Sequence, residues 1–118
     1  MSPQTPSRAA PARRVPASSA RIFAALGDRT RLSILERLGD GQRQSISRLT
    51  HGTRLTRQAV TKHLAVLRKA GLVRHTRRGR EQLFELCPSP IESARETLDA
   101  ISRSWDTALA RLKSFVES

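Results

Sequence analysis

The sequence predicts one mostly α-helical domain that carries a single small β-hairpin, an α+β fold, and three observations support this prediction. From residue 19 onward, apolar residues recur mainly every three or four positions, which is the period of amphipathic helices. Residues 72–86 depart from that period. Two short runs, residues 72–76 and 82–86, flank Arg77-Arg78-Gly79-Arg80, a pattern typical of a β-hairpin with glycine in its turn. A chain of 118 residues is long enough for one modest domain and too short for two.

The N-terminal residues differ from the rest of the chain. Residues 1–18 contain mainly Pro, Ala, Ser and Arg, with almost no large apolar side chain. Such a segment buries too little apolar surface to fold, so we expect a disordered basic tail. The domain then comprises residues 19–118. Its first helix should begin near Ser19 and end at Gly27, since glycine commonly follows the last turn of a helix.

A second helix is indicated by the residues at its two ends. Asp28 is a favourable N-cap, because its side chain can accept a hydrogen bond from a backbone N–H of the first turn. Gly39 is a favourable stop. The residues expected to face inward from this helix are Leu32, Ile34, Leu35 and Leu38.

Two further helices follow, joined by a tight turn. Ser45 can cap a short helix that ends at Gly52. Thr56 can cap a longer helix that ends at Gly71 and buries Val60, Leu64 and Leu67. Two short helices connected in this way form the helix-turn-helix pattern. The hairpin that comes directly after them is in the position of a wing, so the predicted architecture is a winged helix-turn-helix.

The last helix combines a start signal with a long apolar repeat. Ser89-Pro90-Ile91-Glu92 reads as a capping box with proline at the first helical position. The repeat that follows has alternating spacings of three and four, which is a heptad seam. It is longer than so small a domain can cover, so we expect a homodimer interface to which the first helix adds apolar side chains. The interface residues predicted on this basis are Ile22, Phe23, Leu26, Ile91, Ala94, Leu98, Ile101, Trp105, Ala108, Leu112 and Phe115.

Positive charge is concentrated in one part of the chain. The whole sequence carries 22 Lys and Arg against 10 Asp and Glu, a net charge of +12. Residues 41–80 contain eleven Lys or Arg and no acidic residue, whereas residues 81–118 contain four basic and seven acidic residues. A block of one sign repels itself, so it indicates a polyanionic partner. Because the block coincides with the helix-turn-helix and the wing, we expect that partner to be double-stranded DNA.

Candidate DNA contacts lie on the helix after Thr56 and at the tip of the hairpin. Side chains near the start of a recognition helix reach base edges, and those further along meet phosphates. Gln58 can pair with adenine, and Arg57 or Lys62 with guanine. The full set of predicted contacts is Arg57, Gln58, Thr61, Lys62, Arg68 and Lys69 on the helix, with Arg77, Arg78 and Arg80 at the hairpin tip. Further phosphate contacts are expected from Arg43, Arg48 and Arg54.

Other classes of function find little support in the sequence. His51, His63 and His75 fall on different predicted elements without ligand spacing to Cys87, so we expect no metal site and no cofactor. No nucleophile–base pair or paired carboxylates suggest an enzyme. No apolar run approaches the roughly 18 residues of a membrane span, and the N-terminus lacks the apolar core of a secretory signal. A single cysteine suits a reducing cytoplasm, where we place the protein.

Two runs of the sequence resemble a known family. FAALGDRTRLSIL at residues 23–35 resembles the opening of ArsR/SmtB-type regulators, and RQAVTKHLAVL at residues 57–67 with AGLV at 70–73 resembles their recognition helix. The resemblance covers about residues 19–86 and implies a homodimeric repressor of an operator, commonly its own promoter. Metal-responsive members carry Cys-x-Cys in the third helix, or His and acidic ligands in the last. Residues 45–51 contain no cysteine and the last helix no histidine, so the chain is similar to the branch without these metal motifs.

The sequence therefore predicts a transcriptional regulator that binds an inverted repeat as a homodimer and represses, with an unknown inducer. Two alternatives stay open at this point. One is a redox- or metal-responsive repressor that uses Cys87, a residue for which the sequence indicates no other role. The other is a winged-helix protein-interaction module, against which the acid-free basic block of residues 41–80 speaks.

Overall fold

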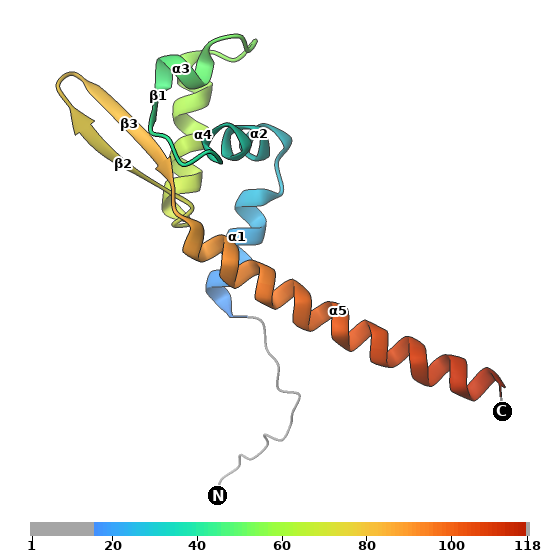
Figure 1. The fold of residues 1–118 in the computed structure, drawn as a ribbon. Coiled ribbons are helices and arrows are strands. Elements are labelled where there is room, and N and C mark those ends of the chain that lie inside the picture. Colours follow the sequence, from blue (N-terminus) through green and yellow to red (C-terminus); the bar gives the residue numbers. More distant parts are fainter. Residues whose placement is uncertain (1–15, 118) are drawn as a thin grey trace, which may run out of the picture.

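Five helices and three strands make up residues 16–117, the part of the chain that the computed structural model describes (Figure 1). In chain order they are α1 (Ala17–Leu26), α2 (Arg29–Leu38), β1 (Gln44–Ser45), α3 (Ile46–Thr50), α4 (Arg57–Lys69), β2 (Val73–Arg78), β3 (Glu81–Leu86) and α5 (Pro88–Glu117). This order confirms the predicted winged helix-turn-helix. Residues 1–15 of the predicted tail lie outside the described residues, and α1 begins two residues before Ser19.

The predicted caps begin the helices as expected. The Asp28 carboxylate accepts a hydrogen bond from the backbone N–H of Arg31 at 2.9 Å and starts α2. The hydroxyl of Ser45 accepts from the N–H of Arg48 at 3.1 Å and starts α3. Likewise, the hydroxyl of Thr56 accepts from the N–H of Ala59 at 3.0 Å and starts α4. Each cap satisfies one of the backbone donors that a helix leaves unpaired at its N-terminus.

The core lies between α2, α3, α4 and the sheet, and aliphatic side chains dominate it. Its fully buried members are Leu38, Leu49, Val60, Leu64, Leu67, Leu72 and Val73. The predicted buried stripe of α4 is thereby confirmed. On α2, Ile34, Leu35 and Leu38 are buried, but the prediction for Leu32 was wrong, because 45% of this residue is exposed. Leu32 lies two positions from Ile34 and three from Leu35, and the turn of α2 carries it to the edge of the buried face.

The hairpin is extended by a third strand. Strands β2 and β3 pair antiparallel from Val73 opposite Leu86 to Arg78 opposite Glu81, and Gly79 in the tip has φ +62°, a left-handed conformation that favours glycine. Strand β1 pairs with the other edge of β3, with Gln44 opposite Phe84. This strand was not predicted from the sequence, since a strand of two residues has no periodicity to detect.

Helix α5 is much longer than the domain that it leaves. It begins at Pro88, so Ser89 lies within its first turn and is not its cap, contrary to the predicted capping box. Helix α1 packs against its N-terminal part, where Ala94 is buried. All residues from 101 to 117 are exposed, and Figure 1 shows this part of α5 projecting away from the other elements. No helix among residues 16–117 combines the length and apolarity needed to cross a membrane.

Candidate nucleic-acid interface

A fixed turn holds α3 and α4 in the helix-turn-helix arrangement. Gly52 has φ +78°, which permits the chain to reverse after α3. The hydroxyl of Thr53 donates to the carbonyl of Thr50 at 2.6 Å and accepts from the N–H of Leu55 at 3.1 Å. The turn therefore ties the end of α3 to the residues just before α4, and the orientation of α4 is set by local hydrogen bonds as well as by the core.

Helix α4 presents three of the six predicted contacts opposite its buried stripe. With 3.6 residues per turn, Gln58, Lys62 and Lys69 point away from the stripe formed by Val60, Leu64 and Leu67. All three are exposed, and among the described residues their side chains make no hydrogen bond or ion pair. They are therefore available to a ligand without breaking a contact in the protein.

The remaining predicted residues of α4 lie on the flank of that face and are already held. The guanidinium of Arg57 donates to the hydroxyl of Ser47 on α3, and the hydroxyl of Thr61 donates to the carbonyl of Arg57 at 2.7 Å. Arg68 reaches the wing, where its guanidinium lies 2.6 Å from a ring nitrogen of His75. Because the hydroxyl of the exposed Thr61 is bonded to its own helix, its methyl group is the part left to contact a thymine methyl.

The wing carries exposed arginines at its tip and a paired carboxylate near its base. Arg77, Arg78 and Arg80 are all exposed. Glu85 on β3 is an acidic residue that the sequence pattern does not single out, and its carboxylate lies 3.2 Å from Arg74 and 3.4 Å from Arg43. Its hydrogen bond with Arg74 raises the pKa of that guanidinium further. The carboxylate thus holds two arginines at the base of the wing and neutralises part of their charge.

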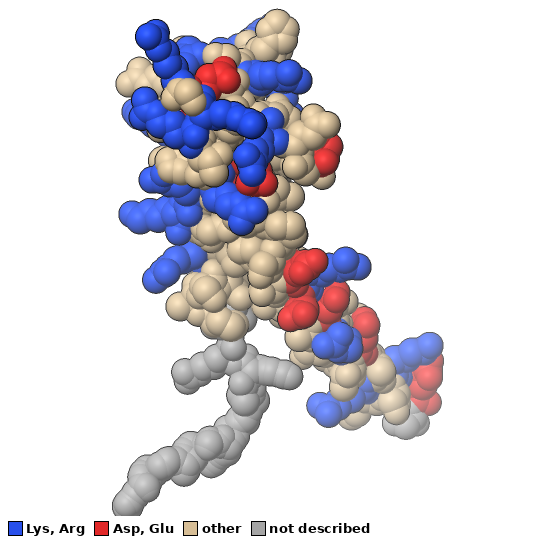
Figure 2. Space-filling view, turned by 60° about the vertical axis from the view of Figure 1, so that its left-hand side comes forward, with Lys and Arg blue, Asp and Glu red and all other residues tan. Residues whose placement is uncertain are grey.

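The charged side chains are unevenly distributed over the surface. Figure 2 shows Lys and Arg spread over the helix-turn-helix and wing, in the upper part of the view, with few acidic side chains among them. Helix α5, at the lower right, carries Asp and Glu beside its Arg and Lys. The basic block of residues 41–80 therefore forms a basic surface around the exposed face of α4, which suits a polyanion.

Arg37 on α2 fixes α3, a role that was not predicted from the sequence. Its guanidinium donates to the carbonyls of Arg48 at 3.1 Å, Leu49 at 2.9 Å and His51 at 3.3 Å. The last carbonyls of a helix lack partners within it, and a cation there also interacts favourably with the helix dipole. Arg37 is thus a C-terminal cap supplied by another helix. A basic residue in the last turn of α2 gives no sequence signal of such a role.

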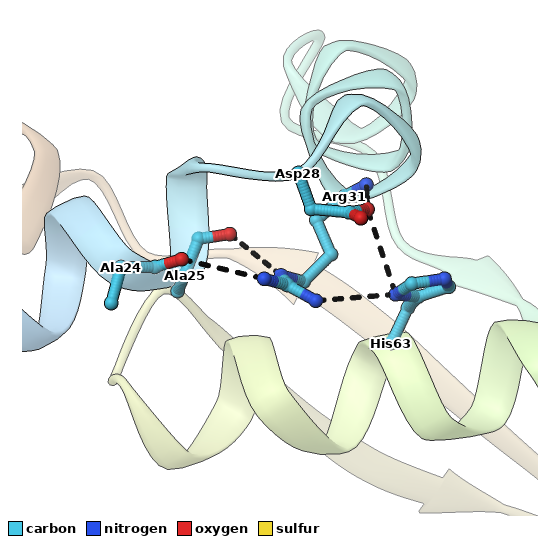
Figure 3. Close-up of polar contacts among 5 residues, drawn as sticks. All are labelled: Ala24, Ala25, Asp28, Arg31 and His63. Carbon is cyan, nitrogen blue, oxygen red and sulfur yellow. Dashed lines mark hydrogen bonds and ion pairs between the residues drawn. The ribbon is translucent and has the colours of Figure 1, made fainter.

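A polar cluster connects α1, α2 and α4 (Figure 3). The Arg31 guanidinium donates to the carbonyl of Ala25 at 2.7 Å and of Ala24 at 3.3 Å, both in the last turn of α1. Its other terminal nitrogen lies 3.5 Å from Nδ1 of His63 on α4. That same ring atom lies 3.8 Å from the carboxylate of Asp28. His63 is therefore part of a polar cluster that links three helices.

The capping role of Asp28 predicts a pH dependence of stability. The hydrogen bond from the Arg31 backbone, together with the positive charge of the Arg31 side chain, holds the pKa of Asp28 below its ordinary value. The ionised carboxylate therefore stabilises the folded protein at pH values above the unfolded pKa of about 4, and this contribution is lost as the pH falls through the lower folded pKa. We expect Asp28→Asn, which keeps a capping oxygen, to lose less stability than wild type between pH 6 and pH 3. Urea unfolding midpoints measured across this range check the prediction, and parallel losses in the two proteins contradict it.

The predicted interface residues fall into three groups by burial in the structure. Ile22 and Ala94 are 4% and 3% exposed, so these two belong to the core of the protomer. Phe23, Leu26 and Ile91 are half-buried against that core. The exposed members are Leu98, Ile101, Trp105, Ala108, Leu112 and Phe115, and the exposed Leu109 and Val116, which the heptad count left out, lie beside them.

The residues considered for metal or redox chemistry do not come together. No group of three or more His, Cys, Asp or Glu within residues 16–117 is arranged to hold a metal ion. Cys87 is a free, half-buried cysteine just after β3, and its backbone N–H donates to the carbonyl of Leu72 at 2.8 Å. His75 packs on Phe84, with ring centroids 5.6 Å apart.

Comparisons with known proteins agree with this arrangement of elements. A helix-turn-helix domain family matches residues 19–76. The HTH-type transcriptional regulator Rv2034 of Mycobacterium tuberculosis is 34% identical over 98 residues, which are 83% of this chain and 88% of that protein. An ArsR-like transcriptional regulator from Rhodococcus sp. RHA1 superposes with a TM-score of 0.73 at 38% identity, covering 84% of this chain and 92% of that one. The chain belongs to the ArsR-type winged helix-turn-helix transcriptional regulators.

Membership of the ArsR-type regulators settles the class of the protein. These are DNA-binding proteins and not enzymes, which confirms the prediction from the sequence. A further relative, the uncharacterized HTH-type transcriptional regulator YuzN of Bacillus subtilis, is 37% identical over 78 residues, covering 61% of this chain and 85% of that protein. In this fold, α3 and α4 form the helix-turn-helix and the β2–β3 hairpin is the wing.

Proposed function

We propose that this ArsR-type regulator represses transcription by binding an inverted repeat as a homodimer, with its own promoter among the targets. The observation that carries the proposal is the apolar face of α5. Leu98, Ile101, Trp105 and Leu112 are 54%, 42%, 64% and 58% exposed, and they recur at heptad spacing on one side of the helix. An exposed apolar face made of several large side chains is typical of a protein–protein interface. The heptad spacing is that of helix-on-helix packing.

A second copy of the chain is the partner that fits this face. Two copies of one helix can bury the same seam against each other about a two-fold axis. That axis relates the two recognition helices, so that they meet half-sites about one helical turn apart on the DNA. The operator is then a near-palindrome, and a protein bound across it at a promoter excludes the polymerase. Because this target is chromosomal DNA, we place the protein in the cytoplasm.

Within each half-site, the residues divide by their position on the domain. Gln58, Thr61 and Lys62, in the first half of α4, read base edges, and Arg57 on the flank assists them once it leaves Ser47. Phosphate contacts come from Arg68 and Lys69 at the end of α4 and from Arg77, Arg78 and Arg80 on the wing. Supporting this division, the side chains of Gln58 and Lys62 are exposed opposite the buried stripe, while Arg68 is directed toward the wing.

The proposal is tested by selecting bound fragments from the source genome. We expect the recovered sequences to share an inverted repeat with half-site centres about 10 base pairs apart, and a reporter behind such a fragment to be silenced when the protein is expressed. Recovery of isolated half-sites, or of fragments without a shared motif, contradicts binding as a two-fold dimer. Activation of the reporter contradicts repression.

A further inference from the structure

The cluster around Arg31 lies at a junction between two parts of the molecule. Helix α1 packs mainly against α5, whereas α4 packs against α2, α3 and β2. The first pair contains the proposed dimer surface, and the second group contains the proposed DNA surface. Arg31, in the first turn of α2, touches both: its guanidinium bonds the end of α1 on one side and approaches His63 of α4 on the other (Figure 3).

The side chains at this junction are suited to fixing the orientation of α4 relative to α1. The carbonyl of Ala25 is among the last carbonyls of α1, which have no partner within the helix, and the planar guanidinium offers donors in several fixed directions. Asp28 completes the arrangement, since its carboxylate caps α2 and faces the ring of His63 at 3.8 Å. The three side chains thus connect the end of α1, the start of α2 and the middle of α4.

We propose that Arg31, with Asp28 and His63, is a positioning element that sets the orientation of the recognition helix α4 relative to the dimer-forming helices α1 and α5. Arg31 touches no DNA in this role. It acts by making the two recognition helices of a dimer rigid with respect to each other, so that the dimer accepts one half-site spacing and rejects others. The inference rests on the proposed function, because spacing has a meaning only for a dimer on a repeat.

Spacing selectivity distinguishes this role from simple stabilisation. Inserting one base pair between two half-sites rotates one against the other by about 35° and moves it by about 3.4 Å, given 10–10.5 base pairs per turn. A rigid dimer cannot engage both half-sites fully on such DNA, whereas a dimer with loosened recognition helices adapts. A residue that only stabilises the fold changes the amount of folded protein and affects both duplexes equally.

The matched variants are Arg31→Gln and Arg37→Gln. Both residues lie on α2, and both donate to carbonyls at the end of a neighbouring helix, but Arg37 caps α3 inside the helix-turn-helix and makes no link to α1. Each variant is titrated against three duplexes: the selected repeat, the same repeat with one inserted base pair, and a single half-site. Thermal unfolding first identifies a temperature at which all proteins are folded, and Arg31→Lys replaces Arg31→Gln if that variant does not fold.

We expect wild type and Arg37→Gln to bind the unaltered repeat roughly tenfold or more tightly than the repeat with the inserted base pair. The insertion weakens one of two linked binding events, which produces a ratio of this order. In Arg31→Gln the ratio should fall to within about threefold, with half-site affinity unchanged from wild type. If Arg31→Gln keeps the full ratio, or if Arg37→Gln reduces it equally, the positioning role is overturned while the proposed function stands. A wild type that binds both repeats equally overturns the positioning role, and one that also binds the single half-site as tightly as the repeats overturns the proposed dimeric binding as well.

Discussion

Replacing Trp105 by glutamate should convert the protein from a dimer to a monomer at micromolar concentration. Trp105 is 64% exposed in the protomer and lies in the middle of the exposed part of the α5 seam. In the proposed dimer it is buried, and the two-fold axis brings two copies of the new carboxylate into one apolar interface. An unpaired buried charge costs roughly 3–5 kcal/mol. The two charges together should destabilise the dimer by more than burial of the apolar seam stabilises it. Operator affinity should fall with the loss of the second recognition helix.

Sedimentation of wild type and variant at matched concentrations measures this effect. Ala110→Glu is the matched control, because Ala110 is exposed on the side of α5 away from the seam and receives the same charge on the same helix. The control should remain a dimer and bind DNA as wild type does. A wild type that sediments as a monomer at micromolar concentration, or a Trp105→Glu protein that stays dimeric, contradicts the proposed interface.

Most features that depend on neighbours in the sequence were predictable here, with the capping box expected at Ser89 as the exception. The caps Asp28, Ser45 and Thr56 each accept a hydrogen bond from the residue three positions ahead, so their chemistry is visible in the sequence itself. The buried stripe of α4 follows from helical period alone. The hairpin was equally clear, because its turn residues and its two strands are contiguous.

Features that depend on contacts between distant segments were not predictable. Arg31 and Arg37 resemble ordinary exposed helix residues until the fold brings Ala25, His63 and the end of α3 to them. Glu85 meets Arg43 across 42 positions of sequence. Polar contacts of this kind use residue types that are also common on surfaces, and no periodicity or spacing in the sequence identifies them.

Exchanging Gln58 for alanine should weaken binding to the selected operator and relax its preference at one position of each half-site. Gln58 is exposed opposite the buried stripe of α4, where its amide can pair bidentately with adenine. Loss of such a pair costs about 1–3 kcal/mol, and a dimer presents the residue twice. On a scrambled duplex, where no such pair forms, the variant should bind as wild type does. Competition titrations with operators changed at single symmetric positions measure the effect.

The comparison variant is Arg78→Ala, which removes charge from the wing and leaves α4 unchanged. Arg78 is exposed at the end of β2, on a separate element from the exposed start of α4. Its replacement should weaken binding to operator and scrambled DNA alike. The slope of log affinity against log salt should fall by about 0.9 for each phosphate that the protein no longer neutralises, so by nearly two for a dimer. The two variants therefore have opposite signatures in one series of titrations. If Gln58→Ala weakened both duplexes equally, Gln58 would contact the backbone, and base reading would have to be assigned to Thr61 and Lys62.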